Sequence, residues 1–565
     1  MYTDGKIYMG LADGERVCMQ LNMANRHGLI AGASGTGKTI TMKAMAESFS
    51  DAGVPVFLCD IKGDVSGLAE PGAQSDGMEK RIDKFGIRQE FSYKAYPVCF
   101  WDIYQEGGHP VRATISDMGP DILSRILGLT PAQEGVLNII FKIADDRGLL
   151  LIDLKDLRTT INYVAEHKDE YTLSYGNMST QSLGGIVRAL LPLETQGGDL
   201  FFGEPDLDIF DWMRTDVYGK GMVNILDCVK LVQNPTLYAS FLLWMMAELF
   251  EKLPEAGDLD KPKLVFFFDE AHMLFSGAPK VLVQKIEQVV KLVRSKGVGI
   301  YFVTQSPSDI PDTVLAQLSN RVQHALRAYT PSEQKAVKVA AQSFRANPNF
   351  KAEDVIMELG VGEALTSFLD EKGVPTMAQK TSIICPQSLM GPAQDATKQN
   401  LMARDGMSKY DQAVDNISAY EMLNDKAEKD AEAAKLAAER AQLEKEKAEF
   451  EAQKAKEEAA AQKQREKEEA AAQKQKEKEE AAAQRQKERE EAAALKQKER
   501  ELEAARKKLE REEEEARKKK EKEAQKKEQE SERRKKQIEN KLINAGINTG
   551  VQVLKRGILN TLFKK

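Results

Sequence analysis

The chain contains 565 residues, of which 42% are hydrophobic and 30% are charged, and its formal net charge is −7. A single compact domain rarely reaches this length, so we expect at least one large hydrophobic core together with additional parts. The negative charge argues against a globally basic nucleic-acid binder, although a local basic pore or groove is compatible with it.

Cysteine spacing and hydropathy narrow the class of protein further. The five cysteines lie far apart without paired spacing, which is typical of reduced core thiols and not of a disulfide framework or a metal cluster. The N-terminus lacks a charged segment followed by an apolar stretch, and the apolar run around residues 241–246 is too short to span a bilayer. We therefore expect a cytoplasmic protein without a transmembrane segment.

The first motif along the chain is a glycine-rich loop at residues 32–39, with the sequence GASGTGKT. A short apolar segment before it reads as a buried strand and the residues after it continue as a helix, which is the context of a Walker A phosphate loop. In that geometry the backbone N–H groups and the helix N-terminus face the phosphates. Lys38 is expected to reach the β- and γ-phosphates, and Thr39 to bind Mg²⁺. The sequence therefore predicts ATP and Mg²⁺ as cofactors, with nucleotide contacts from Gly32, Ser34, Gly35, Thr36, Gly37, Lys38, Thr39 and Ile40.

Further short β-rich segments alternate with helical patterns up to about residue 390. This alternation predicts an α/β fold with a parallel sheet covered by helices on both faces. Residues 112–214 interrupt it with helical periodicity, which predicts a helical insertion that serves as a lid, a partner surface or packing mass. The predicted strands are residues 27–31, 54–60, 98–103, 222–227, 264–269, 299–304 and 322–328.

Two strand ends carry residues suited to hydrolysis. The segment KLVFFFDE at 263–270 is typical of a buried strand that ends in a Walker B acid pair. Asp269 is expected to hold Mg²⁺, and Glu270 to orient and deprotonate the attacking water. Gln305 follows the next strand and is expected to hydrogen-bond the γ-phosphate or that water, because ligands of open α/β sheets gather at the carboxyl ends of the strands. The segment DIKGD at 60–64 lies at the same edge, where a role near Mg²⁺ or a pore and a simple satisfied turn are both open.

Phosphoryl transfer also needs positive charge near the leaving oxygens, often from an arginine of a neighbouring subunit. Arg294 lies at the end of a helix before the strand that leads to Gln305. Arg321 and Arg327 flank the following strand and are further candidates for an arginine finger or sensor. Each of the three is also compatible with an ordinary surface ion pair.

The composition changes after about residue 390. Residues 391–421 read as a polar linker, and residues 422–540 consist largely of Ala, Glu, Lys, Arg and Gln, which predicts a long charged helix. An 11-residue unit, KEEAAAQKQRE, repeats from Lys456 onward and forms a nearly straight alanine stripe. Because alanine buries little area, a solvated single helix is favoured over tight coiled-coil pairing. Residues 541–565 form a short amphipathic segment that suits packing on the protein itself or a neighbouring subunit better than a membrane surface.

As a set, the segments GASGTGKT, FLCDIKGDVSGL, LVFFFDEAHMLF, RSKGVGIYFVTQSPSDIP and LSNRVQHALR resemble the HerA-like branch of the FtsK–HerA ATPases, and the YjgR-like proteins within it. The resemblance covers about residues 1–390 and the short KRGILNTL tail. It implies a RecA-like core that assembles into a ring, expected to be a hexamer. It further implies ATP sites between subunits and an arginine finger given in trans, for which Arg294 matches best.

Three functions follow as hypotheses. The first is a ring-shaped ATPase that hydrolyses ATP to translocate or unwind DNA, an inference from kinship. The second is an ATPase that remodels or assembles a protein partner, with the charged helix as a docking arm. The third, a nucleotide-binding structural protein without turnover, is disfavoured because Glu270 and Gln305 are both present.

Overall fold

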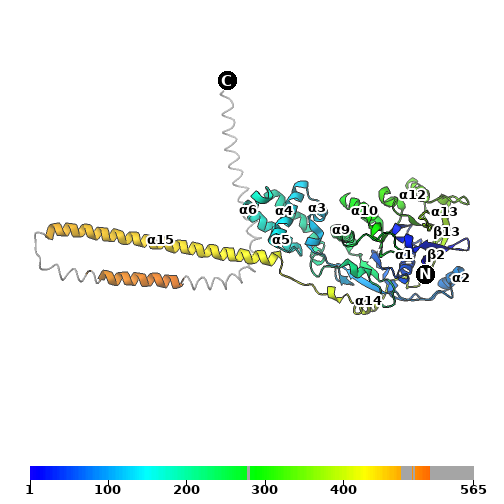
Figure 1. The fold of residues 1–565 in the computed structure, drawn as a ribbon, viewed down its shortest axis with the longest axis horizontal. Helices are drawn as coiled ribbons and strands as arrows, with labels where there is room; N and C mark the ends of the chain where they lie inside the picture. The colour runs from blue at the N-terminus through cyan, green and yellow to red at the C-terminus, as the bar shows by residue number, and fades with distance from the viewer. Residues whose placement is uncertain (277–279, 473–486, 488–489, 509–565) are drawn as a thin grey trace, which may run out of the picture. The chain divides into compact units, whose positions relative to one another are not determined.

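The structure is a computed structural model that describes residues 1–276, 280–472, 487 and 490–508. The chain divides into two compact units, Met1–Lys435 and Leu436–Lys565. Figure 1 follows the order of the elements along the chain by colour. Among the described helices, none combines the length and the apolar character that crossing a bilayer requires.

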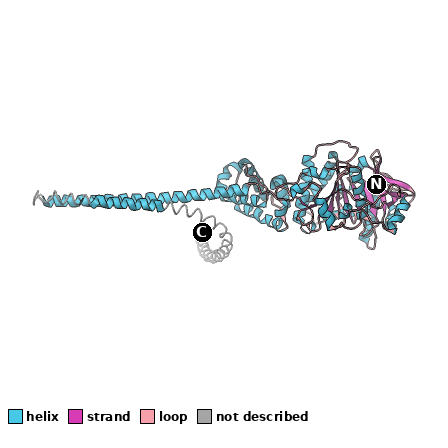
Figure 2. Cartoon of the chain, turned by 90° about the horizontal axis from the view of Figure 1, so that it is seen from below, coloured by secondary structure: helices cyan, strands magenta, loops and turns pink. Residues whose placement is uncertain are grey.

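The first unit is built on a 13-stranded sheet. Its parallel part runs in the order β11-β4-β10-β9-β5-β8-β6-β7, and Figure 2 shows helices packed around the strands. The predicted α/β fold is confirmed, and most of its strands lie within two residues of their predicted ends. These parallel strands are β4 (Gly28–Ala31), β5 (Val56–Asp60), β6 (Val98–Asp102), β7 (His109–Pro110), β8 (Val223–Asp227), β9 (Leu264–Phe268), β10 (Val298–Thr304) and β11 (Asn320–His324). The strand predicted at residues 322–328 is β11, which ends at His324. Residues 325–328 therefore lie outside the observed strand.

Alternate residues of the central strands enter two separate cores, one on each face of the sheet. Phe266 and Phe302 belong to the core on one face, and Val265 and Tyr301 to the core on the other. Strands β4, β5, β9 and β10 are buried along their whole length, so they read in the sequence as continuous apolar runs. Helix α1 (Lys38–Asp51) contributes Phe49 to the second core. Helices α9 (Pro235–Lys252) and α10 (Lys280–Leu292) contribute apolar side chains to the first core.

An antiparallel extension of the sheet was not predicted. It begins beside β11 and runs through β12 (Glu363–Ser367) and β13 (Gln379–Ile383) to the N-terminal strands β2 (Lys6–Ala12), β1 (Tyr2–Thr3) and β3 (Glu15–Gln20). Strands near the N-terminus and strands near residue 380 therefore pair with each other. Helices α2 (Asp76–Phe85), α12 (Pro331–Gln342) and α13 (Ala352–Glu358) complete this part of the unit.

The predicted helical insertion is confirmed. Helices α3, α4 and α5 each begin with a capping box, in which the N-cap side chain and the third helical residue satisfy each other's backbone donors. Their apolar faces join the first core through residues such as Leu123, Ile140 and Ile161. The insertion contains α3 (Ile115–Ile126), α4 (Pro131–Arg147), α5 (Leu154–Glu166), α6 (Lys168–Tyr175), α7 (Thr180–Thr195) and α8 (Gly198–Phe201).

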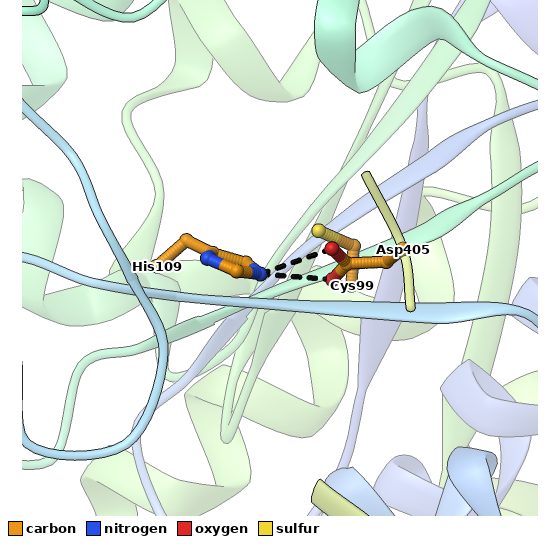
Figure 3. A group of neighbouring side chains, drawn as sticks. All are labelled: Cys99, His109 and Asp405. Carbon is orange, nitrogen blue, oxygen red and sulfur yellow. Dashed lines mark hydrogen bonds and ion pairs between the residues drawn. The ribbon is translucent and has the colours of Figure 1, made fainter. Parts of the chain in front are cut away.

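Residues 391–421, which were predicted from sequence to be a polar linker, are part of the first unit and pack against the rest of it. They contain α14 (Asp395–Met402), and the side chain of Tyr410 is only 2% exposed. The buried ring of His109 lies between two carboxylates of this segment, with Nε2 3.0 Å from Asp405 Oδ2 and Nδ1 2.6 Å from Asp411 Oδ1. Figure 3 shows His109 facing Asp405 and Cys99. A polar composition thus concealed a segment that is held by the carboxylates around His109 and by the buried side chain of Tyr410.

The long charged helix begins slightly earlier than predicted. Helix α15 spans Ala419–Ala472, and most of the described residues between 487 and 508 are also helical. The start of α15 is fixed at Ser418, whose Oγ donates to Asp156 Oδ1 at 2.5 Å. The predicted amphipathic segment 541–565 and the rest of the predicted helix to residue 540 lie outside the described residues.

The ion pairs of His109 predict a pH-dependent stability. Burial opposes protonation of the ring, but hydrogen bonds to Asp405 and Asp411 outweigh it and raise the pKa of His109 above its ordinary value of 6.5. The protonated ring therefore stabilises the fold fully below the unfolded pKa, and this contribution is lost as pH rises through the folded pKa. Urea unfolding at about pH 5.5 and about pH 8.5 should show a loss of stability at the higher pH that His109→Gln reduces. An equally steep pH dependence in His109→Gln would contradict this assignment.

Candidate nucleotide-binding site

The functional side chains gather at the carboxyl edge of the parallel sheet. Strand β10 lies between β4 and β9, with Thr304 opposite Ala31 and Phe302 opposite Phe268. The residues that follow these strands therefore emerge side by side: the glycine loop after β4, the acid pair after β9 and Gln305 after β10. Strand β5, which pairs with β9 on its other side, adds the loop at residues 61–65 to the same edge.

The glycine loop has the backbone geometry that a phosphate loop requires. Gly35 and Gly37 have φ values of 76° and 114°, in the left-handed region that favours glycine. Helix α1 begins at Lys38, so its free N–H groups end at the loop, where they favour an anion. Ser34 and Gly35 are exposed, whereas Lys38 is buried.

Lys38 folds back over the loop. Its Nζ donates to Gly32 O at 2.6 Å and to Ala33 O at 3.1 Å. Burial lowers the pKa of Lys38, and the charges of Glu270 and Asp269 oppose that effect. The charges of the Walker B acids therefore act on the loop lysine, which agrees with their predicted place in one site.

The chain after β11 supports the loop from behind. Ala33 N donates to Ala325 O, and Thr41 Oγ1 lies 2.8 Å from Nε2 of the buried His324. Burial lowers the pKa of His324 to about 4, so its ring is neutral at neutral pH. Its Nδ1 faces Glu363 O at 3.0 Å, which places the proton on Nδ1 and leaves Nε2 to accept from Thr41. Sequence reasoning did not single out His324, because a buried strand histidine carries no local signal of its contacts.

The two Walker B acids are buried and held differently. Asp269 and Glu270 are 2% and 6% exposed. Burial raises the pKa of Asp269 to about 6, which a bound cation would reverse. Glu270 adopts a left-handed conformation with φ 44° and ψ 46°, an unusual backbone for a non-glycine residue that is found most often where function requires it.

Three side chains surround the Glu270 carboxylate. Gln305 Nε2 donates to Glu270 Oε2 at 3.3 Å, and His272 Nδ1 lies 3.2 Å from the same oxygen. Lys62 Nζ lies 2.6 Å from the other oxygen, Oε1. Burial opposes ionisation of Glu270, but the hydrogen bond and charge of Lys62 prevail and lower its pKa. The structure thus brings Gln305 to the predicted place and adds Lys62 and His272.

The segment at 60–64 forms the satisfied turn that was one of its two alternatives, and a role near Mg²⁺ or a pore stays a prediction. The Asp60 carboxylate accepts hydrogen bonds from Gly63 N at 2.7 Å and Val65 N at 3.2 Å, so the turn satisfies itself. Lys62, at the tip of that turn, nevertheless reaches the Walker B acids. Asp64 lies within electrostatic range of Asp269, and its Oδ1 is buried without a hydrogen-bond partner among the described residues. Thr39 and Asp269 stay the predicted Mg²⁺ ligands, and Asp64 is a further carboxylate near Asp269.

The three candidate arginines occupy different environments. Arg321 is committed to the fold, because its guanidinium donates to the carbonyls of Leu318, Ser343 and Leu315. Arg327 donates to the carbonyls of Met357 and Leu359. Both are therefore poorly placed to serve as a finger or sensor.

Arg294 differs from the other two arginines. It is exposed in a short 3-10 helix (Val293–Lys296), and no described side chain forms a hydrogen bond or ion pair with its guanidinium. Arg294 precedes β10 whereas Gln305 follows it, so the seven residues of this strand, about 20 Å at 3.3 Å per residue, separate them. Arg294 therefore lies at the sheet edge opposite its own phosphate loop.

A second group of side chains could hold a metal ion. The ligand atoms of Cys99, His109 and Asp405 all lie within 4.8 Å of one another (Figure 3). The sequence predicted no metal cluster because the five cysteines lack paired spacing. This group contains only one of them, Cys99. Asp405 already pairs with His109 Nε2 and accepts from Met407 N, and Nδ1 of His109 pairs with Asp411.

Comparisons with known proteins place this geometry in a family. A family model described as Helicase HerA-like C-terminal matches residues 9–486. The chain belongs to this family. The parallel sheet with β10 between β4 and β9 is accordingly the RecA-like core that the sequence resemblance implied.

Individual relatives are distant. The chain is 26% identical over 171 residues to the DNA double-strand break repair helicase HerA of Sulfolobus acidocaldarius, which covers 29% of this chain and 33% of that protein. The plasmid coupling protein TrwB in complex with ADP and Mg²⁺ is similar with a TM-score of 0.47 and 16% identity, covering 70% of this chain and 93% of that one. VirB4 of Thermoanaerobacter pseudethanolicus gives a TM-score of 0.43 and 15% identity, with 68% and 97% coverage. The chain thus spans 33% and 28% of the first two curated relatives that it matches.

Two glycines of the phosphate loop give a matched test of its packing. A Cβ added to Gly32 would lie 2.5 Å from His324 Cβ, whereas one added to Gly35 meets nothing within 4 Å. We expect Gly32→Ala to lower the free energy of unfolding by about 3 kcal/mol or more through overpacking, and Gly35→Ala by about 1 kcal/mol through its left-handed backbone. Denaturant unfolding without nucleotide measures both. Equal effects would show that His324 does not support the loop.

Proposed function

We propose that the protein hydrolyses ATP with Mg²⁺ and assembles into a ring, expected to be a hexamer, that uses this energy to translocate or unwind DNA. The observation that carries the hydrolysis is the convergence of the Lys38 loop, the Asp269–Glu270 pair and Gln305 at one sheet edge. Within the HerA-like family, we further propose that the protein belongs to the YjgR-like branch, on the basis of its motif sequences.

The side chains divide the reaction among them. The glycine loop and Lys38 bind the β- and γ-phosphates, and Thr39 and Asp269 hold Mg²⁺, which neutralises charge on the transferred phosphoryl group. Glu270 accepts a proton from the attacking water, while Gln305 fixes the carboxylate and that water by hydrogen bonds. The short distance between Gln305 and Glu270 supports this assignment, because a base must be oriented before it can act.

The position of Arg294 supports assembly into a ring. An arginine at the opposite edge from its own phosphate loop can act only on the nucleotide of a neighbouring subunit, in trans. A groove of about 800 Å³ beside Gln305, lined by His272, Asp309 and Asp312 among others, offers an acidic approach for such a cation. Repeated head-to-tail contacts of this kind close into a ring when the rotation permits.

DNA is favoured as the substrate by the family and by the similarity to HerA, a DNA double-strand break repair helicase. The net charge of −7 gives this proposal no support. A protein substrate is the second candidate, because the charged helix α15 extends for 54 residues and could dock a partner.

We place the protein in the cytoplasm on the basis of its cysteine usage.

Phosphate release by purified protein tests the hydrolysis. Lys38→Ala is expected to lose nucleotide binding, whereas Glu270→Gln should bind ATP and lower turnover by about 10²- to 10⁴-fold, the usual contribution of a general base. Turnover should rise with DNA at low salt and fall as salt is added. A wild-type protein that releases no phosphate would refute hydrolysis. Stimulation by protein extracts with no response to DNA would favour the second candidate.

The trans arginine can be tested by mixing variants. Arg294→Ala is expected to lower kcat by about 10³-fold with little effect on ATP binding, as loss of an arginine finger does. Mixing it with Glu270→Gln should restore part of the activity, because mixed rings contain sites with both residues intact. Arg188→Ala, at an exposed arginine of α7, serves as the control. Full activity of Arg294→Ala alone would exclude Arg294 as the finger. An impaired variant that does not recover on mixing would exclude its action in trans.

A further inference from the structure

Lys62 is a cation at the reaction centre that neither the phosphate loop nor the Walker B motif includes. Its Nζ lies 2.6 Å from Glu270 Oε1 and 4.0 Å from Asp269 Oδ2. Its side chain is 42% exposed, whereas those of the two acids are almost fully buried. Lys62 therefore approaches the buried acids from the open side of the site.

Hydrogen bonds hold the backbone of the turn that carries Lys62, whereas its side chain is partly exposed. Asp60 holds the turn through the N–H groups of Gly63 and Val65. Gly63, with φ 75°, supplies the left-handed residue that the turn needs. A flexible side chain on a fixed turn is the arrangement expected of a residue that exchanges one partner for another.

The ion pair is not required to hold the strands together. Strands β5 and β9 already pair through their backbones, with Cys59 opposite Phe268. The pair instead offsets the cost of burying the carboxylate of Glu270, whose side chain is 8% exposed, while the lysine remains 42% exposed. A second anion in the open part of the site can therefore compete for Lys62.

We propose that Lys62 senses the γ-phosphate and controls Glu270, an inference that rests on the proposed ATP hydrolysis. In the empty or ADP-bound site, Lys62 pairs with Glu270 Oε1 and keeps water from that oxygen. When ATP binds, the γ-phosphate attracts Lys62 and releases Oε1. The Oε2 atom remains held by Gln305 and lies beside His272, so the base keeps its orientation while the other oxygen becomes available to the attacking water.

Charge and distance support this exchange. In the empty site Lys62 faces Asp269 and Glu270, with Asp64 within electrostatic range, and Lys38 is already occupied by loop carbonyls. A triphosphate with one Mg²⁺ brings net negative charge, which gives Lys62 a stronger partner than a single carboxylate. A base that acts through one water lies within a few ångströms of the γ-phosphate, which is within reach of a lysine that already touches that base.

The test compares Lys62→Gln, Lys62→Arg and the control Lys230→Gln in the full-length protein. Lys230 also follows a strand of the sheet and pairs with a carboxylate, Glu106, at 2.5 Å, but it does not contact the Walker B acids. The affinities of MgATPγS and MgADP are measured by displacement of a fluorescent nucleotide, together with kcat and KM for ATP.

We expect Lys62→Gln to weaken MgATPγS binding by about tenfold or more, the loss of one charge-assisted hydrogen bond, and MgADP binding by less than about twofold. The loss should appear in KM for ATP and in the ratio of the two affinities, and kcat is expected to fall as well, because a cation on the γ-phosphate also stabilises charge in the transition state. Lys62→Arg should restore most of the discrimination between the nucleotides, and Lys230→Gln should behave as wild type.

Equal weakening of both nucleotides, or a lower melting temperature with discrimination unchanged, would overturn the proposal and leave a structural ion pair. A large fall in kcat without a change in discrimination would overturn it too. These outcomes are separate from a failure of the proposed function, in which the wild-type protein itself binds neither nucleotide or releases no phosphate.

Discussion

The parallel pairing of β4, β10, β9 and β5 is the constraint on which the site depends. Because neighbouring parallel strands end at the same edge, their registers bring a glycine loop, two acids, a glutamine and a lysine together from four distant parts of the sequence. The registers are themselves fixed by burial, since a shift of one residue would turn Phe266 and Phe302 toward the opposite core. The chemistry at the edge therefore depends on apolar packing on both faces of the sheet.

The same burial determines the electrostatics of the site. Asp269 and Glu270 are removed from water, which is costly unless each has a partner. Glu270 has Lys62, Gln305 and His272, whereas Asp269 has the N–H of Glu270 at 2.9 Å and a distant Lys62. Asp269 is thus the less neutralised acid, which agrees with its raised pKa and suits it to a divalent cation. Lys62 would link these two roles, because it lies between the metal ligand and the base.

Much of the fold and the centre of the site could be predicted because their signals are local. The phosphate loop is a contiguous motif, and buried parallel strands are continuous apolar runs, so β5, β9 and β10 were placed within about two residues. The predictions for Asp269, Glu270 and Gln305 followed from their places at strand ends, and the distance of Gln305 from Glu270 agrees with them. The helical insertion was recognised by periodicity alone.

The remainder depended on contacts between residues far apart in the sequence. Residue chemistry alone did not separate Arg321 and Arg327 from Arg294, and only the fold shows that backbone carbonyls occupy their guanidinium groups. The segment at 391–421 looked like a linker because its few buried apolar residues, such as Met407 and Tyr410, are scattered among polar ones, and its pairing of Asp405 and Asp411 with His109 is not visible in the sequence. The strands β12 and β13 were missed because they pair antiparallel with distant partners and are only partly apolar.

The central claim is that the phosphate loop and the Walker B acids form one nucleotide–metal site. Electron paramagnetic resonance of Mn²⁺ in place of Mg²⁺, titrated with ATPγS, tests it directly. The account predicts one tightly bound Mn²⁺ per nucleotide in the wild-type protein, and weaker Mn²⁺ binding with nucleotide still bound in Asp269→Asn. Mn²⁺ binding that is unchanged in Asp269→Asn, or that occurs without nucleotide, would contradict it.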